Sequence, residues 1–338
     1  MTTPTLTVVA PCYNETEVLR ETNRQVLAAL ESLSAQGLIS PDYVICYVDD
    51  GSSDGTWELI EALRSEHGCV QGLRLSRNRG HQNALFAGLM EAPGDALISI
   101  DADLQDDPAV IEQMVRSFRA GHDVVYGVRA DRSTDGSFKR WSAELYYRVL
   151  AMLGVSVVFN HADFRLLSRR AVETLREYRE VNLFLRGLMP QLGFPSSTIP
   201  YTRQARFAGE SKYPLGKMIA LALEGVTSFS AAPLRAITVL GISVSAISVL
   251  LAVWAAWLAV FTEQAVPGWA SIVVPMALLG GVNLFCVGII GEYVAKIYLE
   301  VKARPRYTVQ DRIGAATGPA GTVMPSAAAS ARDAVNAQ

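Results

Sequence analysis

The stretch ALISIDADLQDDP, residues 96–108, decides the fold class of this 338-residue chain. It begins as a short strand-like run, and acidic residues follow immediately. Stretches of helical length separate this run from similar ones, and residues 17–33 carry apolar side chains mostly at helical spacing. The alternation predicts βαβ units and an α/β domain with a mainly parallel, Rossmann-like sheet. The other strand-like runs are TLTVVA (5–10), YVICYV (43–48) and DVVYGV (123–128).

Polar clusters stand directly after the predicted strands. In parallel α/β sheets, ligands bind beyond the carboxyl ends of the strands, so these clusters are expected to meet at one site. Four converging polar loops indicate a nucleotide-type site. The clusters are PCYNE (11–15), DDGSSDGT (49–56), SRNRGHQN (76–83) and DADLQDDP (101–108).

Asp101 and Asp103 form the strongest candidate for a metal site. Two carboxylates on alternate residues leaving a strand are able to share one divalent cation, and Gln105 offers a neutral oxygen. Mg²⁺ and Mn²⁺ prefer such oxygen ligands and bridge diphosphate oxygens, where they neutralise charge on a departing nucleotide. The competing interpretation is a solvated acidic turn, which the preceding apolar strand disfavours.

Nucleotide contacts are predicted after the first two strands. Small residues in DDGSSDGT allow a close approach of backbone amides, and a carboxylate there is able to accept from a base or ribose. Pro11, Tyr13, Asn14 and Glu15 are suited to stack on and bind a base. Capping of the next helix is the competing use of both segments.

Basic residues gather in the middle region, where a phosphate-bearing ligand would need them. Asp163 lies two residues before Arg165 and is predicted to position that guanidinium and the acceptor, or to deprotonate the acceptor. A solvated basic face is the alternative for each cation. The four histidines have no ligand spacing. The candidate cations include Arg129, Lys139, Arg140, Arg165, Arg206 and Lys212.

Two apolar segments follow the catalytic region, which is assigned to residues 1–214. Residues 236–261 and 270–291 are 26 and 22 residues long without a charge, and about 20 suffice to cross a bilayer. They predict a two-helix membrane hairpin within residues 233–298. An amphipathic helix at 215–232 precedes it, which either lies in the membrane interface or packs on the domain. Basic flanks predict that the catalytic domain and the tail at 299–338 are cytoplasmic, with disorder after about residue 311. A buried core helix is the alternative for either span.

Overall charge and cysteine usage exclude some classes. The 30 basic and 33 acidic residues leave a net charge of −3, which argues against a nucleic-acid partner. Four cysteines show no CxxC pair or disulfide spacing, and no cleaved signal peptide is evident.

Together these motifs resemble the family-2 inverting glycosyltransferases of the GT-A fold, and within them the polyprenyl-phosphate branch, which includes the bactoprenol glucosyltransferases. The resemblance covers about residues 5–307. Its further elements are ADFRLLSR (162–169), RFAGESKYPLGKM (206–218) and GEYVAKIYLEVKARPRY (291–307).

The resemblance implies roles for particular residues. Asp50, Ala102 and the PCYNE segment would hold the nucleotide, and Asp101, Asp103 and Gln105 would form the metal site. Arg206, Ser211 and Lys212 would lie on a loop closing over the donor phosphates, and Asp163 would lie at the acceptor. Asp103, Asp163 and Arg165 are accordingly the catalytic candidates.

The implied reaction is the inverting transfer of a hexose, glucose in the first instance, from a UDP-sugar to undecaprenyl phosphate at the cytoplasmic membrane. UDP-N-acetylglucosamine stays open as the donor, and so does self-association into a homo-oligomer. A processive polysaccharide synthase is disfavoured because Ser137 stands where its Gln-x-x-Arg-Trp motif needs glutamine. A non-catalytic binding scaffold is disfavoured by the intact acidic motif, and a dehydrogenase by the lack of GxGxxG.

Overall fold

The computed structural model describes residues 3–129, 161–181, 185–202 and 268–314, together with single positions and short runs between 234 and 257. Within these residues the chain forms eight strands in one sheet, in the order β7-β5-β6-β4-β1-β2-β3-β8. The strands are β1 (Leu6–Cys12), β2 (Val44–Asp49), β3 (Val70–Leu75), β4 (Ala96–Ser99), β5 (Val124–Arg129), β6 (His161–Ser168), β7 (Ser196–Tyr201) and β8 (Val309–Ile313).

The centre of the sheet is parallel. β1 pairs in parallel with β2 and β4, and β2 pairs in parallel with β3. β6 inserts antiparallel between β4 and β5, which makes the sheet mixed. The prediction of a mainly parallel α/β sheet is confirmed, and the carboxyl ends of its four predicted central strands share one edge.

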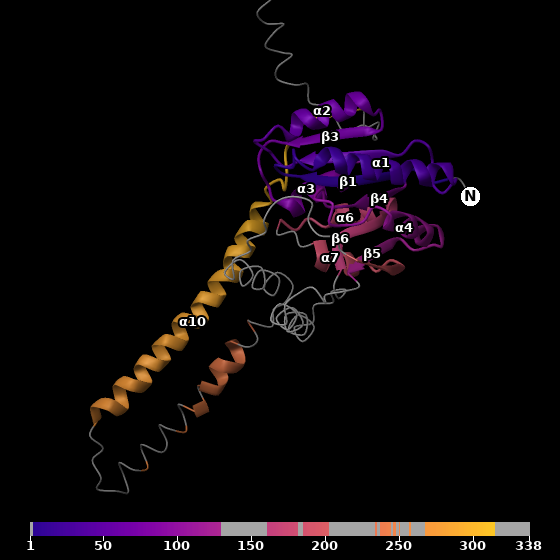
Figure 1. Cartoon of the computed structure of the whole chain (residues 1–338). Helices are drawn as coiled ribbons and strands as arrows, with labels where there is room; N and C mark the ends of the chain where they lie inside the picture. The colour runs from indigo at the N-terminus through magenta and orange to yellow at the C-terminus, as the bar shows by residue number, and fades with distance from the viewer. Residues whose placement is uncertain are drawn as a thin grey trace, which may run out of the picture.

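Helices cover both faces of the sheet (Figure 1). On one face, α1 (Leu19–Ala35), α2 (Thr56–Glu66) and α4 (Val110–Arg119) bury apolar side chains against the strands. On the other face lie α3 (His81–Glu91), α6 (Arg169–Glu177) and α7 (Leu185–Gln191). The domain therefore has three layers, which is the arrangement expected for βαβ units.

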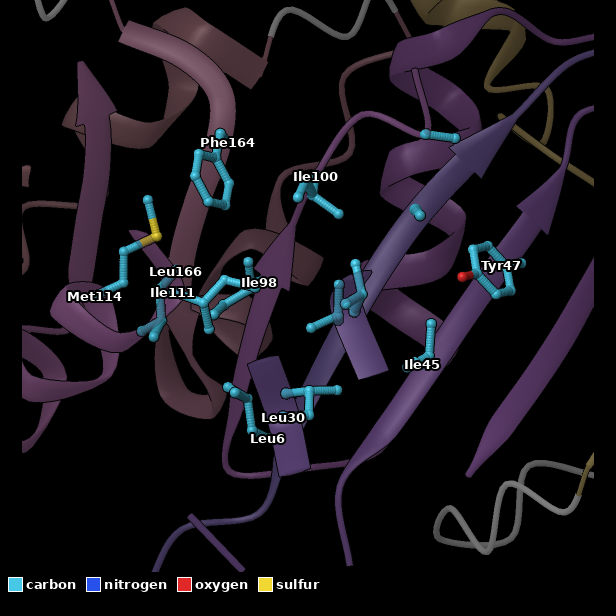
Figure 2. Close-up of a cluster of buried hydrophobic side chains, with 14 of the residues drawn as sticks. Leu6, Leu30, Ile45, Tyr47, Ile98, Ile100, Ile111, Met114, Phe164 and Leu166 are labelled. Atoms are coloured by element: carbon cyan, nitrogen blue, oxygen red, sulfur yellow. The ribbon is translucent and has the colours of Figure 1, made fainter. Parts of the chain in front are cut away.

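The larger core fills the layer beneath α1 and α4. Figure 2 shows Leu30, Ile111 and Met114 meeting strand residues such as Ile98 and Leu166. These side chains are removed from water almost completely, and each such burial stabilises the fold by about 1.5–3 kcal/mol. This packing fixes β4 and β6, and with them the residues at their ends.

The opposite core fixes α3 closely on the central strands. A Cβ atom at Gly88 would lie 2.3 Å from Val9 Cγ1 and 2.7 Å from Val48 Cγ2, so only glycine allows the helix to sit this near the sheet. The first residue of α3, His81, is consequently held at a fixed height above the carboxyl ends of the strands.

A long helix, α10 (Gly268–Lys302), projects from the three layers and leads back to them (Figure 1). After it, β8 pairs antiparallel with β3 at the edge of the sheet. Tyr307 and Arg312 both bond to Glu91 at the end of α3, at 2.8 Å each. The expected tail at 299–338 therefore begins as the last turn of α10, and β8 then attaches it to the edge of the sheet, so the predicted disorder begins no earlier than residue 314.

Membrane spans are not established by the described residues. Among them, no helix meets the combined length and apolarity needed to cross a bilayer. The expected helix at 215–232 lies outside the described residues, as do most of 236–261 and everything after 314.

Candidate active site

The loops after β1 and β2 are joined by hydrogen bonds at the carboxyl edge of the sheet. The Asn14 amide donates to Ser52 Oγ, and Asn14 Oδ1 accepts from the Ser53 amide, both at 2.9 Å. Asn14 has a φ of 56°, a left-handed conformation that asparagine tolerates better than most residues. Tyr13, beside it, is 48% exposed. These loops form a fixed platform that presents an aromatic ring to solvent.

Asp50 connects the β2 loop to the loop after β3. Its two carboxylate oxygens accept hydrogen bonds from the amides of Arg79 and Gly80, at 2.7 and 2.9 Å. Burial raises the pKa of Asp50, and these two amides act in the opposite direction. Gly51 has a φ of +70°, and a Cβ there would lie 2.8 Å from backbone atoms of Arg77 and Asn78. Asp50 and Gly51 thus fix the conformation of the loop after β3 as well as that of their own loop after β2.

The loop after β4 is constrained on both sides of the acidic pair. The carbonyl of buried Ala102 accepts from Thr22 Oγ1 at 2.7 Å, and Asp103 Oδ1 accepts from the Gln105 amide at 3.2 Å. Leu104 has a φ of 58°, which costs energy for a branched side chain and points to a loop held in one conformation. This loop fixes the acidic side chains at the end of β4.

Gln105 bears on whether a cation fits here. Its Oε1 is buried and accepts no hydrogen bond from any described residue. A buried carbonyl oxygen without a donor is costly unless something else supplies a positive partner. No group of three or more His, Cys, Asp or Glu side chains in the described part of the chain has metal-binding geometry. Carboxylate and amide oxygens are the ligand types that Mg²⁺ and Mn²⁺ prefer, so the residues of this loop are of the right chemistry for such a cation.

A buried charge cluster lies beside this loop, under α3 and α7. Asp163 in β6 pairs with Arg165 two residues along the same strand. It also pairs with Arg186 of α7, whose Nη2 is 3.0 Å from Asp163 Oδ2 and whose Nε is 3.3 Å from Oδ1. His81 Nε2 lies 3.7 Å from Asp163 Oδ2 and 3.5 Å from Asp101 Oδ1. His81 therefore stands between the acidic loop and the cluster.

The cluster keeps Asp163 ionised. Burial by itself would raise the pKa of Asp163, but Arg186, Arg165 and His81 together lower it well below its usual value. Burial lowers the pKa of Arg165, and the negative charge of Asp163 opposes that effect. An anion flanked by two guanidinium groups is a weak proton acceptor at neutral pH, so Asp163 is suited to orient these arginines.

Comparison with known proteins identifies the family of this chain. The family model for glycosyl transferase family 2 matches residues 7–176. An uncharacterized glycosyltransferase of Bacillus subtilis is 46% identical over 310 residues, which cover 90% of this chain and 91% of the relative. The chain belongs to glycosyl transferase family 2.

Other similar proteins have more specific descriptions. A bactoprenol glucosyl transferase of Shigella phage SfX is 39% identical over 308 residues, which cover 91% of this chain and 99% of the relative. Among solved structures, glucosyl-3-phosphoglycerate synthase from Mycobacterium tuberculosis matches with a TM-score of 0.44 and 20% identity. That match covers 66% of this chain and 76% of the synthase.

The structure of this family-2 enzyme places most of the predicted residues at one edge. The PCYNE segment, Asp50 and the acidic loop all follow neighbouring strands, with Pro11 still inside β1 opposite Val48. Asp163 and Arg165 lie close by in β6, and Arg165 is only 1% exposed. Several predicted phosphate-binding residues lie outside the described residues: Lys139, Arg140, Arg206, Ser211, Lys212 and the side chain of Arg129.

Two members of the charge cluster were not among the predicted site residues. His81 lies in the polar segment after β3. The sequence does not mark it as a site residue, because the four histidines have no spacing typical of metal ligands. Arg186 stands among mostly apolar residues and belongs to no polar cluster in the sequence. Only its contact with Asp163 shows that it belongs to the site.

Proposed function

We propose that this family-2 enzyme transfers glucose from UDP-glucose to the phosphate of a polyprenyl lipid at the cytoplasmic face of the membrane. The observation that carries the proposal is the position of His81, within 3.7 Å of both Asp101 and Asp163. The acidic loop suits a divalent cation that would bind a nucleotide diphosphate, and the guanidinium groups beside Asp163 suit a second anion. The choice of a polyprenyl lipid and of glucose is supported by relatives that are described as bactoprenol glucosyl transferases.

The donor would occupy the platform formed by the first two loops. Tyr13 offers an exposed ring for stacking on the base, while Glu15 and Asp50 offer carboxylate oxygens. Because the amides of Arg79 and Gly80 use one lone pair of each Asp50 oxygen, the carboxylate keeps further acceptor capacity. Arg206, Ser211 and Lys212 are proposed to cover the donor phosphates.

A divalent cation fits the acidic loop. Asp101, Asp103 and Gln105 would hold it, since they combine two carboxylates with a buried amide oxygen that lacks a described donor. When bound, Mg²⁺ or Mn²⁺ supplies charge neutralisation for the departing UDP. The strained Leu104 holds the two aspartates at the strand end.

The acceptor would approach from the side of the charge cluster. An oxygen of the lipid phosphate attacks the anomeric carbon opposite the leaving diphosphate, and configuration is inverted. With a second pKa of about 6, a phosphate monoester is largely ionised at neutral pH and needs no strong base. Asp163 accordingly serves to position Arg165 and Arg186, and catalysis rests on placement and charge stabilisation.

The chain is proposed to anchor in the membrane through residues 236–261 and 270–291. Neither segment contains a charge, and the first lies mostly outside the described residues. Along α10, large apolar side chains such as Ile272, Met276 and Val287 are each more than half exposed, which favours a lipid environment. The only charge in the connecting segment 262–269 is Glu263, whereas the outer flanks are basic, so both ends are placed in the cytoplasm.

A direct assay tests the reaction. Membranes containing the protein are incubated with undecaprenyl phosphate, Mg²⁺ or Mn²⁺, and a panel of labelled nucleotide sugars, and the lipid is then extracted. Label from UDP-glucose is expected in the lipid fraction. Label from UDP-N-acetylglucosamine alone would support the second candidate donor, and no lipid label from any sugar would refute the proposed function.

Topology has its own test. Gln264→Cys is expected to react with an impermeant thiol reagent in intact cells, whereas a cysteine placed after residue 314 is expected to stay unlabelled. The native cysteines are first replaced by serine to remove background. The reverse labelling pattern would contradict the proposed orientation.

A further inference from the structure

We propose that Arg186 of α7, rather than Arg165, receives the phosphate of the acceptor. The inference rests on the proposed function, since it assigns a residue to the acceptor of that same reaction. Sequence reasoning pointed to Arg165 because it stands two residues from Asp163. The structure provides a second guanidinium on the same carboxylate, and the two differ in how far a ligand is able to reach them.

Accessibility separates the two arginines. Both bond to Asp163, but the side chain of Arg165 is 1% exposed and that of Arg186 is 35% exposed. Arg165 lies in a central antiparallel strand, opposite Ser99 of β4 and Tyr126 of β5. A phosphate carrying a long lipid could reach it only if this part of the sheet opened. Arg186 is the one of the pair that such a ligand reaches without that change.

The guanidinium groups give this part of the site its capacity to bind an anion. Asp163 lies against two of them, and Asp101 joins the same cluster through His81. Arg165 Nε and Nη1 are buried and donate to no partner among the described residues. In a poorly solvated setting a guanidinium attracts an anion strongly, and the ligand is expected at the accessible guanidinium position of the pair. That position is Arg186.

The backbone around Arg186 is held firmly enough to present it. Its neighbours Leu185 and Leu188 are completely buried in the core beneath α3. The Leu185 amide donates to Gln82 Oε1 at 2.9 Å, which ties the start of α7 to the first turn of α3. His81, in that same turn, is in contact with Asp101 of the acidic loop. Arg186 is therefore fixed relative to the place where the donor diphosphate would lie.

In this arrangement Asp163 orients the guanidinium group of Arg186 and does not accept a proton from the acceptor. It holds Nε and Nη2 of Arg186, which directs the guanidinium plane. Arg165 is the buried counter-ion that keeps Asp163 ionised. A merely structural ion pair between Asp163 and Arg186 would leave acceptor affinity unaffected by a conservative change at Arg186 that preserves folding. This difference makes the inference testable.

The test compares Arg186→Gln with wild type in the full-length protein. KM and kcat are measured with undecaprenyl phosphate as the varied substrate, and the dissociation constant of UDP is measured separately. Farnesyl phosphate is added as a competitor, with farnesol as its uncharged counterpart. Arg116→Gln is the matched control, because Arg116 is a surface arginine paired with Glu112 of its own helix on the other face of the sheet.

The expected result is a rise of about tenfold or more in KM for the lipid phosphate, with UDP affinity within about twofold of wild type. Farnesyl phosphate should lose its potency as a competitor to the same extent, and farnesol should be unaffected. Arg116→Gln should match wild type in every measurement. Arg186→Lys keeps the positive charge but not the bidentate geometry of the guanidinium group, so it should give an intermediate KM. If Arg186→Gln does not fold, the lysine variant is compared with wild type instead.

Several outcomes would overturn the inference. An unchanged acceptor KM in a folded Arg186 variant would assign Arg186 a structural role only, and a fall in UDP affinity alone would move it to the donor. Both results require a wild-type enzyme that glycosylates the lipid phosphate. If wild type itself transfers sugar to no lipid phosphate, the proposed function fails, and this inference fails with it.

Discussion

The two halves of the candidate site are built by different physical means. On the donor side, the loops after β1, β2 and β3 are joined by neutral or singly charged hydrogen bonds to backbone amides, as at Asn14 and Asp50. On the acceptor side, β6 and α7 contribute a buried carboxylate with two guanidinium groups. The donor half gains a fixed shape from its loops, and the acceptor half gains a local charge.

This difference predicts how each half should respond to substitution. A neutral hydrogen bond contributes about 0.5–1.5 kcal/mol to stability, whereas breaking a buried ion pair costs about 3–5 kcal/mol because it leaves a charge unpaired. Substitutions in the acceptor half should therefore lower the stability of the fold more than substitutions in the donor half. The acidic loop between the halves should be the most sensitive in activity.

The largest effect is expected from Asp103→Asn in the acidic loop. The amide keeps the size and the local hydrogen-bonding capacity of the side chain but removes a charge needed to hold a cation. Transfer to the lipid phosphate should fall about 100-fold or more, with little change in thermal stability. The measurement is the initial rate across a range of Mg²⁺ and Mn²⁺ concentrations. Near wild-type rates at low metal concentration would remove Asp103 from the metal site.

Asp163→Asn should cause the largest loss of stability. It removes the carboxylate that pairs with the buried Arg165 and with the partly exposed Arg186, and breaking such a buried ion pair costs about 3–5 kcal/mol. Denaturant unfolding in detergent, followed by tryptophan fluorescence, measures the difference. Arg116→Gln serves as the surface control and should unfold as wild type does. A change in Asp163→Asn no larger than in this control would show that the cluster does not stabilise the fold.

Comparison of the same variant with wild type should show that the stabilisation from Asp163 depends on pH. The pKa of Asp163 is below its usual value in the folded state, so its contribution is complete above the unfolded-state pKa of about 3.9. That contribution is lost as the pH falls from there toward the lower folded pKa. The stability difference between wild type and Asp163→Asn should thus be constant near neutrality and shrink below about pH 4. A difference that grows on acidification would contradict an ionised Asp163.

Asp50→Asn should have a smaller effect on the donor side. One of the two amides, of Arg79 or Gly80, would face an amide group instead of a carboxylate oxygen, at a cost of about 1–3 kcal/mol. The loop after β3 should loosen, so UDP affinity should fall while the KM for the lipid phosphate changes little. Equal losses for donor and acceptor would show that the two halves are not separable.

The smallest effect is expected from Ser52→Ala. Its hydroxyl accepts one neutral hydrogen bond, from the Asn14 amide in an exposed setting, so the loss should be about 0.5–1.5 kcal/mol. Thermal unfolding and UDP binding measure it. A loss as large as that of Asp163→Asn would overturn the contrast between the two halves.

The donor half was predictable from the sequence because each of its motifs directly follows its own strand. A run such as ALISI followed by DADLQ specifies both the strand and its polar end, and parallel pairing then brings these ends together. The prediction of the acidic loop, the PCYNE segment and Asp50 at one edge needed no knowledge of distant contacts.

The pairing of Asp163 with Arg165 was predictable from their spacing, but the part of Arg186 and the strand β8 depended on contacts between residues far apart in the sequence. Nothing adjacent to Arg186 indicates that it faces Asp163, and an arginine within a strand gives no sign of burial until its carboxylate partner is known. The segment VQDRI at 309–313 is mostly polar and resembles a tail. It becomes a strand because the edge of β3 is available for pairing.

The most direct test of the account compares one lipid in two forms. Purified protein with UDP-glucose and a divalent cation is offered undecaprenyl phosphate or undecaprenol of the same chain length, and labelled lipid is measured for each. Because the acceptor half offers the partly exposed guanidinium of Arg186 beside an ionised Asp163, only the phosphate should be glycosylated. Equal labelling of the alcohol would contradict the account, since it would require a proton acceptor where the structure places an ion pair.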